Sequence, residues 1–278
     1  LTAVLFFLFF SENIFFAYSV FKWNNNAKNV AGVSVVIIGV RKRDNSMKKL
    51  YNEVECKQLS HIPPTLSDSV DNMVKKATKS ISKLPYMRRG NMPNDKEFLR
   101  LSPLEKKDIL EHYPNAVKFI RLQIGADELI NQVERYCYWI SDEDLEEAEK
   151  IMPIKNAIDK CREYRINSKD KTLHVQAEKA HQMREFFECN EMSLVIPIVS
   201  SESREYIPMN FVPDKTIVPN SAQVIYDANL FVFGVLTSKM HILWTKHNAG
   251  RLDNRIRYSI FLCYNTFPFP SISDTKKS

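Results

Sequence analysis

The sequence predicts a mixed α/β chain built from two folding units, and three observations support that prediction. Residues 33–40 form a β-branched apolar run that is typical of a strand buried on both faces in a sheet. From about residue 85 onward, capped amphipathic helices and short apolar strands follow one another, a pattern typical of an α+β domain. Residues 61–84 are mostly polar, include Pro63-Pro64 and are predicted to connect the two units. The length of 278 residues suffices for two domains of ~100–200 residues each.

Composition excludes several classes of protein. Hydrophobic residues make up 44% and charged residues 26% of the chain, so its bulk is expected to fold around a core that needs no disulfides or metals. The six glycines stand at positions 32, 39, 90, 125, 234 and 250. Because the closest pair is seven apart, neither G-x-G-x-x-G nor G-x-x-x-x-G-K-[ST] can occur. Dinucleotide-binding, kinase-type and P-loop glycine motifs are therefore excluded.

Charge and cysteine usage bear on partners and compartment. Lys and Arg number 39 against 33 Asp and Glu, a net charge of +6 that tolerates a polyanionic partner without demanding one. The five cysteines are scattered and never in C-x-x-C spacing, which favours reduced thiols in a cytoplasmic protein. Neither they nor the six dispersed histidines have the spacing of a metal site, so no metal is expected.

The first ten residues, Leu1 to Phe10, are apolar throughout. A helix of that length reaches about 15 Å, half of the ~30 Å hydrocarbon core of a bilayer, and Ser11-Glu12-Asn13 then interrupts the run. No basic segment or small-residue cleavage site marks a secretory signal. We therefore expect a buried segment and no membrane association. Because no initiator Met is present, we also expect the sequence to begin inside a longer reading frame.

Local signals predict the first elements of the second unit. Ser102 as N-cap, Pro103 at the first helical position and Glu105 predict a helix over 102–112, with a second amphipathic helix over 114–122. The alternating, aromatic-rich residues 133–140 predict a strand.

The chain from Ser141 to residue 187 is predicted to be mostly helical. Ser141 caps an acidic helix start, where carboxylates suit the positive end of the helix dipole. Residues 153–187 form a charge-rich helical stretch. Its Lys and Arg side chains either follow a nucleic-acid backbone or face water, and the second arrangement is the more common.

The remaining elements are predicted from apolar runs and prolines. Short strands at 193–199, 204–209 and 223–225 are split by prolines and are predicted to be edge-like. Residues 231–247 predict one helix whose buried stripe includes Met240 and Trp244, and Gly250 ends it.

The segment from Arg251 to Tyr258 is the most suggestive candidate for a binding site. In an extended strand Asp253, Arg255 and Arg257 point to one side, opposite to residues 252, 254 and 256. The guanidinium of Arg255 fits O6 and N7 of guanine, and the carboxylate of Asp253 can accept from the cytosine amino group, so the two can read one G·C pair. The alternative is a surface ion pair between them, which spacing alone favours. Nearby cations can hold phosphates: Lys239, Lys246, Arg251 and Arg257.

No active site can be composed from the sequence. Ser200, Ser201 and Ser203 lack the flanking glycines of G-x-S-x-G, and no histidine can be assigned to them. His241 in the predicted helix 231–247 is more simply a satisfied core or groove histidine than a general base. No catalytic residue is therefore predicted.

Motifs along the chain resemble one family in unbroken order from about 14 to 270. Phe16 to Trp23, Asn26 to Asn29 and Val33 to Gly39 resemble the closing strands of the catalytic domain in MmeI-like (type IIL) restriction–modification DNA methyltransferases. The following motifs resemble the target recognition domain of that family: Gly90 to Asp95, Lys118 to Arg121, Glu134 to Trp139, Ser200 to Pro208, Phe233-Gly234, Ser238 to His241, Ala249 to Leu252, Arg257 to Ser259 and Tyr264 to Pro268. Residues 1–13 match poorly, and Leu122-Gln123-Ile124 departs from the family pattern.

The resemblance implies an α/β architecture in which closing strands of a methyltransferase sheet are followed by an α+β target recognition domain. Residues 1–60 are then the C-terminal remnant of the catalytic domain, 61–84 a connector and 85–278 the target recognition domain. The family transfers a methyl group from S-adenosylmethionine to an adenine in a short double-stranded DNA site, and many members carry an endonuclease. The implied function is sequence-specific DNA recognition within an adenine-specific methyltransferase of a restriction-modification system.

The chemistry of that family is not complete in this sequence. Its Asn-Pro-Pro-Tyr/Phe loop is missing, since the only Pro-Pro, at 63–64, follows His61-Ile62, and a cofactor-binding glycine loop is excluded. We therefore expect no cofactor in this chain, with S-adenosylmethionine and the active site supplied by an upstream methyltransferase domain of the full-length protein. The alternative is a non-catalytic DNA-binding fragment from a disrupted gene.

The resemblance also changes the interpretation of residues 251–258. In the family, the residues just after Gly-Arg-Leu determine which base pair is accepted at one position, and Asp253 and Arg255 occupy those places here. This favours base readout over the ion pair, with Arg255 on guanine and Asp253 on the paired cytosine. The DNA backbone would be held by Lys239, Lys246, Arg251, Arg257 and Arg204.

Overall fold

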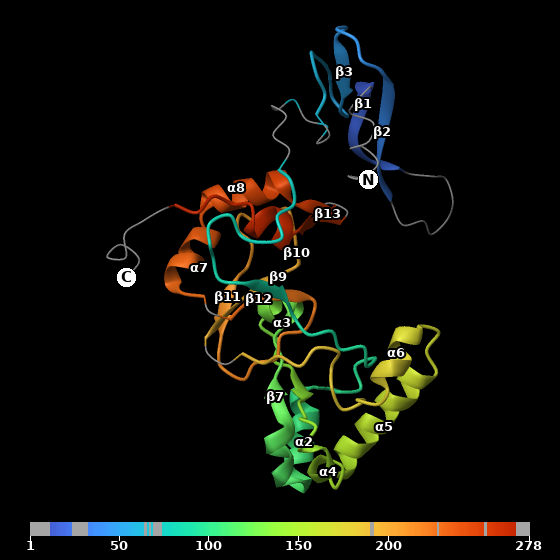
Figure 1. The fold of residues 1–278 in the computed structure, drawn as a ribbon, viewed down its shortest axis with the longest axis vertical. Helices are drawn as coiled ribbons and strands as arrows, with labels where there is room; N and C mark the ends of the chain where they lie inside the picture. Colours follow the sequence, from blue (N-terminus) through green and yellow to red (C-terminus); the bar gives the residue numbers. More distant parts are fainter. Residues whose placement is uncertain are drawn as a thin grey trace. The chain divides into compact units, whose positions relative to one another are not determined.

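The computed structural model divides the chain into two compact units, residues 1–73 and 74–278, and each is described by itself (Figure 1). It describes residues 12–23, 33–63, 66, 68, 74–189, 192–226, 228–252 and 255–270, with the backbone alone at positions 22, 33, 34 and 251. The division falls within the stretch predicted as a connector, and the assignment of the segments to domains stays a prediction. The apolar segment 1–10 lies outside the described residues. Among the residues described, no helix is long and apolar enough to cross a membrane.

The first unit contains a four-stranded sheet in the order β2-β1-β3-β4. Its strands are β1 (Glu12–Trp23), β2 (Val33–Lys42), β3 (Lys48–Tyr51) and β4 (Cys56–Leu59). β1 pairs antiparallel with β2 and parallel with β3, and β3 pairs antiparallel with β4. An apolar cluster of Ile14, Ala17, Leu50 and Ile62 forms its core.

The strand predicted at 33–40 is present as β2, but the prediction that it is buried on both faces is wrong. β2 is the outermost strand of the sheet and pairs with β1, and Ile37 is 41% exposed. A continuous apolar run is buried on both faces only where other elements cover both faces. In the described part of the first unit no helix is present to do so.

The described part of the second unit contains three small sheets. The largest has the order β11-β9-β12-β5 and joins Asn210–Val212, Ser193–Pro197, Ala222–Ile225 and Met87–Arg89. Another has the order β6-β8-β7 and joins Arg100–Leu101, Tyr136–Tyr138 and Ile120–Leu122. The third has the order β10-β14-β13 and joins Val199–Ser200, Arg255–Arg257 and Gly250–Leu252. All pairs in these sheets are antiparallel.

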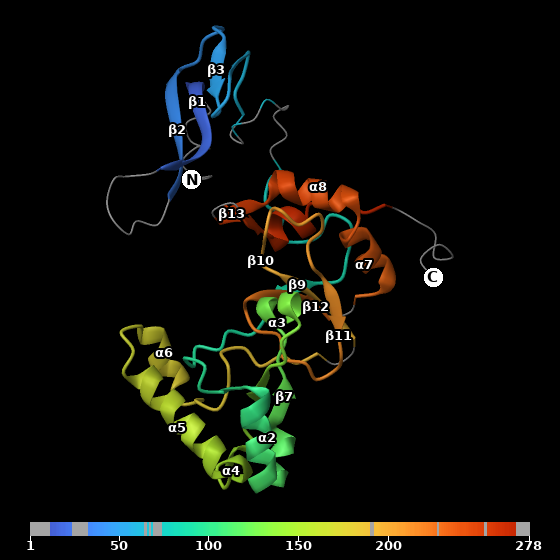
Figure 2. The ribbon, with the colours of Figure 1, turned by 180° about the vertical axis from the view of Figure 1, so that it is seen from behind.

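The helices of the second unit fall into two groups. The first comprises α2 (Pro103–His112), the 3-10 turn η1 (Pro114–Phe119), α3 (Ala126–Asn131), α4 (Leu145–Ala148), α5 (Met152–Ile166) and α6 (Lys171–Gln176). The second comprises α7 (Leu230–Leu236), α8 (Lys239–Asn248) and the π-helical turn η2 (Ile260–Tyr264). In both ribbon views α2, α4 and α5 lie at the opposite end of the unit from α7 and α8 (Figures 1 and 2).

Each group of helices has its own apolar core. Residues 97–182, here called the helical region, bury a cluster that includes Leu101, Phe119, Tyr138, Ile154 and Ile158. Residues 228–270, here called the C-terminal region, pack onto β9, β12 and β5 through a cluster that includes Ile196, Ile225, Leu236, Ile242 and Tyr264. The C-terminal region is thus fixed to the largest sheet of the unit.

The helix predicted at 102–112 is confirmed. In α2 the Ser102 hydroxyl accepts from the Glu105 amide at 3.3 Å, and the Glu105 carboxylate accepts from the Ser102 amide at 2.7 Å, which completes a capping box. The helix predicted over 114–122 is wrong in its second half, because residues 120–122 pair with β8 as strand β7. The strand predicted over 133–140 is present only as β8, where β6 and β7 flank it.

The single helix predicted over 231–247 is wrong. α7 ends before Thr237, and the Ser238 hydroxyl accepts from the His241 amide at 3.2 Å to begin α8. This break shifts the helical phase, so that His241, Ile242 and Thr245 face the core. Met240, predicted to be buried, is instead 72% exposed, and Trp244 is half-buried. Apolar spacing alone cannot show such a shift.

The other predicted elements are partly confirmed. The strand at 193–199 forms as β9 and β10, but β9 is not edge-like: it is fully buried between β11 and β12. Residues 204–209 form no strand, and the next strand, β11, begins at Asn210. The helical stretch predicted over 153–187 is present only in part. It forms the two helices α5 and α6, and turns and bends follow α6.

Arg165 near the end of α5 is buried, although the stretch was expected to expose its basic residues. It is 1% exposed and donates at 2.8–3.0 Å to five backbone carbonyls, those of Pro93, Asn94, Gln176, Lys179 and Gln182. A signal for this burial is present in the sequence, because Arg165 continues the helical spacing of the buried residues Ile154, Ile158 and Cys161.

Candidate nucleic-acid interface

Two arginines lie on the same exposed face of a small sheet. In the β13–β14 hairpin Leu252 is paired with Arg255 and Gly250 with Arg257, and residues paired directly across a sheet share a face. Arg255 and Arg257 are exposed, whereas Ile256 between them is buried. The period of two along a strand therefore presents both guanidinium groups on one side, as predicted.

The prediction of one continuous extended segment over 251–258 is wrong. The chain reverses between β13 and β14, so Leu252 shares a face with Arg255 and is exposed, where it was expected to lie with Ile256. An alternating pattern does not distinguish a long strand from a hairpin with a short turn. Asp253 lies between the two strands and outside the described residues, as does the side chain of Arg251. Their predicted contacts stay predictions.

Tyr258, directly after β14, fixes the hairpin to the body of the unit. It is 2% exposed, and its amide donates to the Ile198 carbonyl at 2.8 Å. Its carbonyl accepts from the Gln223 side chain on β12 at 3.0 Å. Its hydroxyl lies 2.9 Å from Nε2 of His241 on α8. No role was predicted for Tyr258, although it continues the alternation of buried residues that Ile256 begins.

His241 is a core histidine, as the sequence analysis favoured. It is fully buried, its ring makes an edge contact with Phe267, and its hydrogen bond to Tyr258 joins α8 to β14. Burial lowers the pKa of His241 to about 4 and raises the pKa of Tyr258 well above its usual value. Both groups are therefore neutral near pH 7, and the contact between them is a neutral hydrogen bond.

The predicted phosphate ligands occupy the elements next to the hairpin. Lys239 is exposed in the first turn of α8 and Lys246 is half-buried in its last turn, shortly before β13 begins. Arg204 is exposed in the loop that follows β10, and β10 is the neighbour of β14 in the sheet. The structure thus places Lys239 and Lys246 on α8, which is followed along the chain by the β13–β14 hairpin that carries Arg257. Arg204 lies in the loop after β10, the strand that pairs with β14.

The C-terminal region is strongly basic. Residues 228–270 contain five Lys or Arg and a single acidic residue, Asp253. A segment whose own residues have this balance of charge favours a polyanionic partner.

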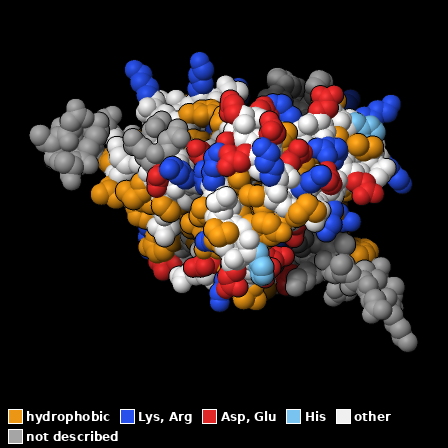
Figure 3. All heavy atoms as spheres, turned by 90° about the horizontal axis from the view of Figure 1, so that it is seen from below, with side chains coloured by type: hydrophobic (Ala, Val, Ile, Leu, Met, Phe, Trp, Pro, Cys, Tyr) orange, Lys and Arg blue, Asp and Glu red, His pale blue; other side chains and the backbone are white. Residues whose placement is uncertain are grey.

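The helical region has a different charge distribution. Its basic side chains lie beside acids: Lys118 contacts Asp144 and Glu147, Lys150 contacts Glu146, and Arg162 contacts Asp159 and Glu149. Figure 3 views the molecule from this end and shows Lys and Arg side chains intermingled with Asp and Glu. Of the two arrangements considered for residues 153–187, the structure favours a solvated, charge-balanced face.

No three His, Cys, Asp or Glu side chains among the described residues come together as a metal ion would require. Ser201 and Ser203 were considered above as nucleophiles. Their hydroxyl oxygens lie 2.8 Å apart and share a hydrogen bond in the loop after β10.

Comparisons with known proteins show the family. The model of the MmeI target recognition domain matches residues 68–271, and that of the MmeI DNA-methyltransferase domain matches residues 2–52. The chain is 41% identical over 270 residues to DNA methyltransferase A of Bacillus subtilis (strain 168), a match that covers 97% of the chain and 31% of the relative. It is also similar to the solved structure of the type IIL restriction-modification enzyme MmeI in complex with DNA, with a TM-score of 0.91 and 34% identity, over 100% of this chain and 38% of that one.

These findings confirm the family predicted from the motifs. They also match the mixed α/β fold with several small sheets to a solved member of that family. The chain spans about a third of the length of these relatives, 31% of one and 38% of the other. The chain belongs to the MmeI family of restriction-modification DNA methyltransferases and comprises its target recognition domain together with a fragment of its DNA-methyltransferase domain.

Proposed function

We propose that the second unit binds double-stranded DNA through its C-terminal region and thereby selects the site at which the full-length enzyme methylates an adenine. The observation that carries the proposal is the pair of exposed arginines on a hairpin that Tyr258 anchors, within a segment holding five basic residues and one acid. The solved relative was determined in complex with DNA, which supports the same partner for this chain.

In this proposal, base readout and phosphate binding fall to different side chains. Arg255 donates both guanidinium hydrogens of one edge to O6 and N7 of guanine, and Asp253 accepts from the amino group of the paired cytosine. Lys239, Lys246, Arg251, Arg257 and Arg204 hold phosphates and set the register of the hairpin in the major groove without reading sequence. Discrimination at the contacted base pair then amounts to about 1–3 kcal/mol.

We place methyl transfer outside this chain. The described residues do not fit S-adenosylmethionine: the core of the first unit is formed by the apolar side chains Ile14, Ala17, Leu50 and Ile62, and the glycines are too far apart for a G-x-G loop. The proposal therefore assigns the cofactor and the active site to a methyltransferase domain upstream in the full-length, cytoplasmic protein. The task of this chain is to hold the duplex in register while the target adenine leaves the stack.

A salt titration of DNA binding tests this proposal. Each phosphate contact contributes about −0.9 to the slope of log K against log salt concentration. Replacing Lys239 and Arg257 with Gln should therefore make the slope shallower by about 2 and weaken binding to all sequences alike, as measured by fluorescence anisotropy.

The matched control replaces Lys150 and Lys160, exposed lysines of the helical region, with Gln. This variant loses the same formal charge and should keep the slope of the unmodified chain. If both variants changed the slope equally, non-specific charge would explain binding and the proposed interface would be wrong.

A further inference from the structure

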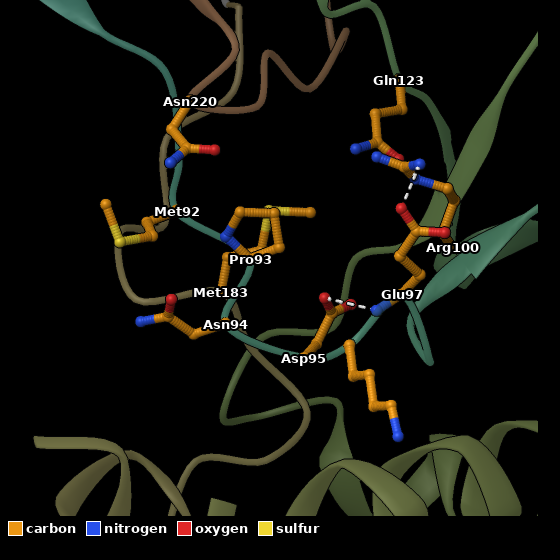
Figure 4. Close-up of a pocket in the computed structure, with 10 residues that line it drawn as sticks. Met92, Pro93, Asn94, Asp95, Glu97, Arg100, Gln123, Met183 and Asn220 are labelled. Atoms are coloured by element: carbon orange, nitrogen blue, oxygen red, sulfur yellow. Dashed lines mark hydrogen bonds and ion pairs between the residues drawn. The ribbon is translucent and has the colours of Figure 1, made fainter. Parts of the chain in front are cut away.

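A pocket of about 310 Å³ lies in the second unit (Figure 4). It is lined by the segment Met92 to Glu97, which links β5 to β6, and by Arg100, Gln123, Met183 and Asn220. The volume is at the lower end of the range for small-molecule sites, so it suits a single ring system better than a larger ligand. Neither the hairpin nor its predicted phosphate ligands contribute to it.

One wall of this pocket is held in a strained conformation. Asn94, Lys96 and Glu97 adopt left-handed backbone conformations, with φ of 48°, 51° and 66°. Such conformations cost roughly 1–2 kcal/mol for residues other than glycine, and they persist only where the surroundings enforce them. Arg165 does so from within, by donating to the carbonyls of Pro93 and Asn94 at 3.0 Å. The wall is therefore rigid before any ligand arrives.

Three charged side chains of the pocket, Asp95, Glu97 and Arg100, are already paired. The two carboxylate oxygens of Asp95 accept from the amides of Glu97 and Leu99 at 3.0 and 3.1 Å. Glu97 and Arg100 form an ion pair at 2.8 Å. A ligand that leaves these three interactions intact is held by other groups of the lining, which include the exposed Lys96.

Two carboxamides of the lining are placed to meet such a ligand. Gln123 is 2% exposed, and its Oε1 has no hydrogen-bond partner among the described residues, an arrangement that costs about 1–3 kcal/mol unless a donor is supplied. The amide of Asn220 reaches into the opening from the opposite side (Figure 4). The two amides therefore present donors and acceptors that converge on one small volume.

Thioethers supply the apolar part of the lining. Met92 and Met183 border the pocket, and Met183 is buried in a cluster with Trp139, which stacks on Phe186 at 3.9 Å between ring centroids. Methionine side chains are flexible and make favourable contacts with aromatic rings, often at the ring edge. The lining therefore combines carboxamides with thioethers, and both kinds of group can contact a nucleobase.

We propose that this pocket binds an adenine ring. Asn and Gln amides pair bidentately with N6 and N7 of adenine, donating to N7 and accepting from the N6 amino group, and the unpartnered Oε1 of Gln123 is a ready acceptor for that group. The ring could come from a base extruded from bound DNA or from a free adenine nucleoside. The recognition chemistry is the same for both, and the experiment separates them. The free-nucleoside arm does not rest on the proposed function.

Isothermal titration of the full chain with adenosine tests the site directly. Adenosine should bind at least about tenfold more tightly than guanosine, because guanine has acceptors at both O6 and N7 and offers Gln123 Oε1 no donor at that edge. Gln123→Leu keeps the volume but removes the acceptor and should weaken adenosine binding at least about tenfold, while Gln58→Leu, at an exposed position in β4, should leave it unchanged. Asn220→Ala at a half-buried position provides a second variant should Gln123→Leu not fold.

A second arm identifies the source of the ring. The base next to each adenine of a bound duplex is replaced in turn with 2-aminopurine, whose fluorescence rises when the adenine stacked against it leaves the helix. The adenine itself then keeps the N6 group that the pocket is proposed to bind. A rise that Gln123→Leu abolishes would assign the pocket to an extruded base, and adenosine binding without such a rise would assign it to a free nucleoside. Loss of DNA binding alone would contradict the proposed function and leave the adenosine result standing. The proposal is overturned if neither adenosine nor 2-aminopurine responds, or if Gln123→Leu and Asn220→Ala change neither response.

Discussion

The helical region and the C-terminal region both expose lysines and arginines, but they surround them differently. In the helical region Lys118, Lys150 and Arg162 each lie within 4 Å of a carboxylate. Such exposed pairs contribute only about 0–1 kcal/mol each and leave little charge to act at a distance. The C-terminal region has one acid, Asp253, for five basic residues. The comparison teaches that the distribution of acids, more than the number of cations, shows where a polyanion can bind.

The largest expected effect concerns Arg165, the buried cation of the helical region. Arg165→Met should lower the free energy of unfolding by about 3–5 kcal/mol, because five backbone carbonyls lose their donor in the interior. Urea denaturation measures the loss. Arg162→Met, on the same helix but partly exposed, should cost no more than about 1 kcal/mol. Equal effects would contradict the structural role of Arg165.

His241 should make the C-terminal region sensitive to acid. Its pKa is about 4 in the folded chain and near 6.5 when unfolded, so the unfolded state binds the proton first as pH falls. The stability that the neutral ring contributes is fully present above pH 6.5. It declines as the pH falls from 6.5 to 4 and is lost below pH 4. The loss in the free energy of unfolding amounts to about 3 kcal/mol.

The difference in unfolding free energy between the wild type and His241→Gln isolates this contribution from other titrating groups. The difference should narrow by about 3 kcal/mol between pH 7 and pH 4. A difference that stayed constant with pH would show that His241 titrates normally and is not buried as described.

Tyr258→Phe should produce a smaller change with a distinct signature. It removes the hydroxyl that meets His241 at 2.9 Å, at a cost of about 1–2 kcal/mol, and frees β14 to shift against α8. Base preference on a duplex library should flatten, while the salt slope should change by less than about 1, the amount expected for the loss of one phosphate contact. Tyr138→Phe, an equally buried tyrosine of the helical region, should leave base preference untouched. A loss of affinity without flattened preference would contradict the positioning role of Tyr258.

Local chemistry made several parts of this fold predictable. Ser102 and Glu105 are three residues apart and satisfy each other, so the start of α2 depends on nothing distant. Arg255 and Arg257 lie on the same exposed face because alternate residues of any strand share a face, and this holds whichever strand pairs with β14.

The errors arose where tertiary contacts decide the structure. Ser238 is a good N-cap, but the apolar spacing runs on across it, and only packing of His241 against Tyr258 shows that the helix restarts there. The reversal after Leu252 follows from pairing between strands, which alternation cannot reveal. The left-handed Lys96 and Glu97 lack the glycine that normally marks such a conformation, so the pocket they line has no sequence signal.

The central claim is that the hairpin of the C-terminal region reads a G·C pair, and a charge swap within it tests this most directly. Asp253→Lys combined with Arg255→Asp keeps both positions charged, and base preference at every position is measured by selection from a randomised duplex library. The account predicts that preference changes at one base pair, by about 1–3 kcal/mol, and holds elsewhere. Unchanged preference at all positions would contradict it.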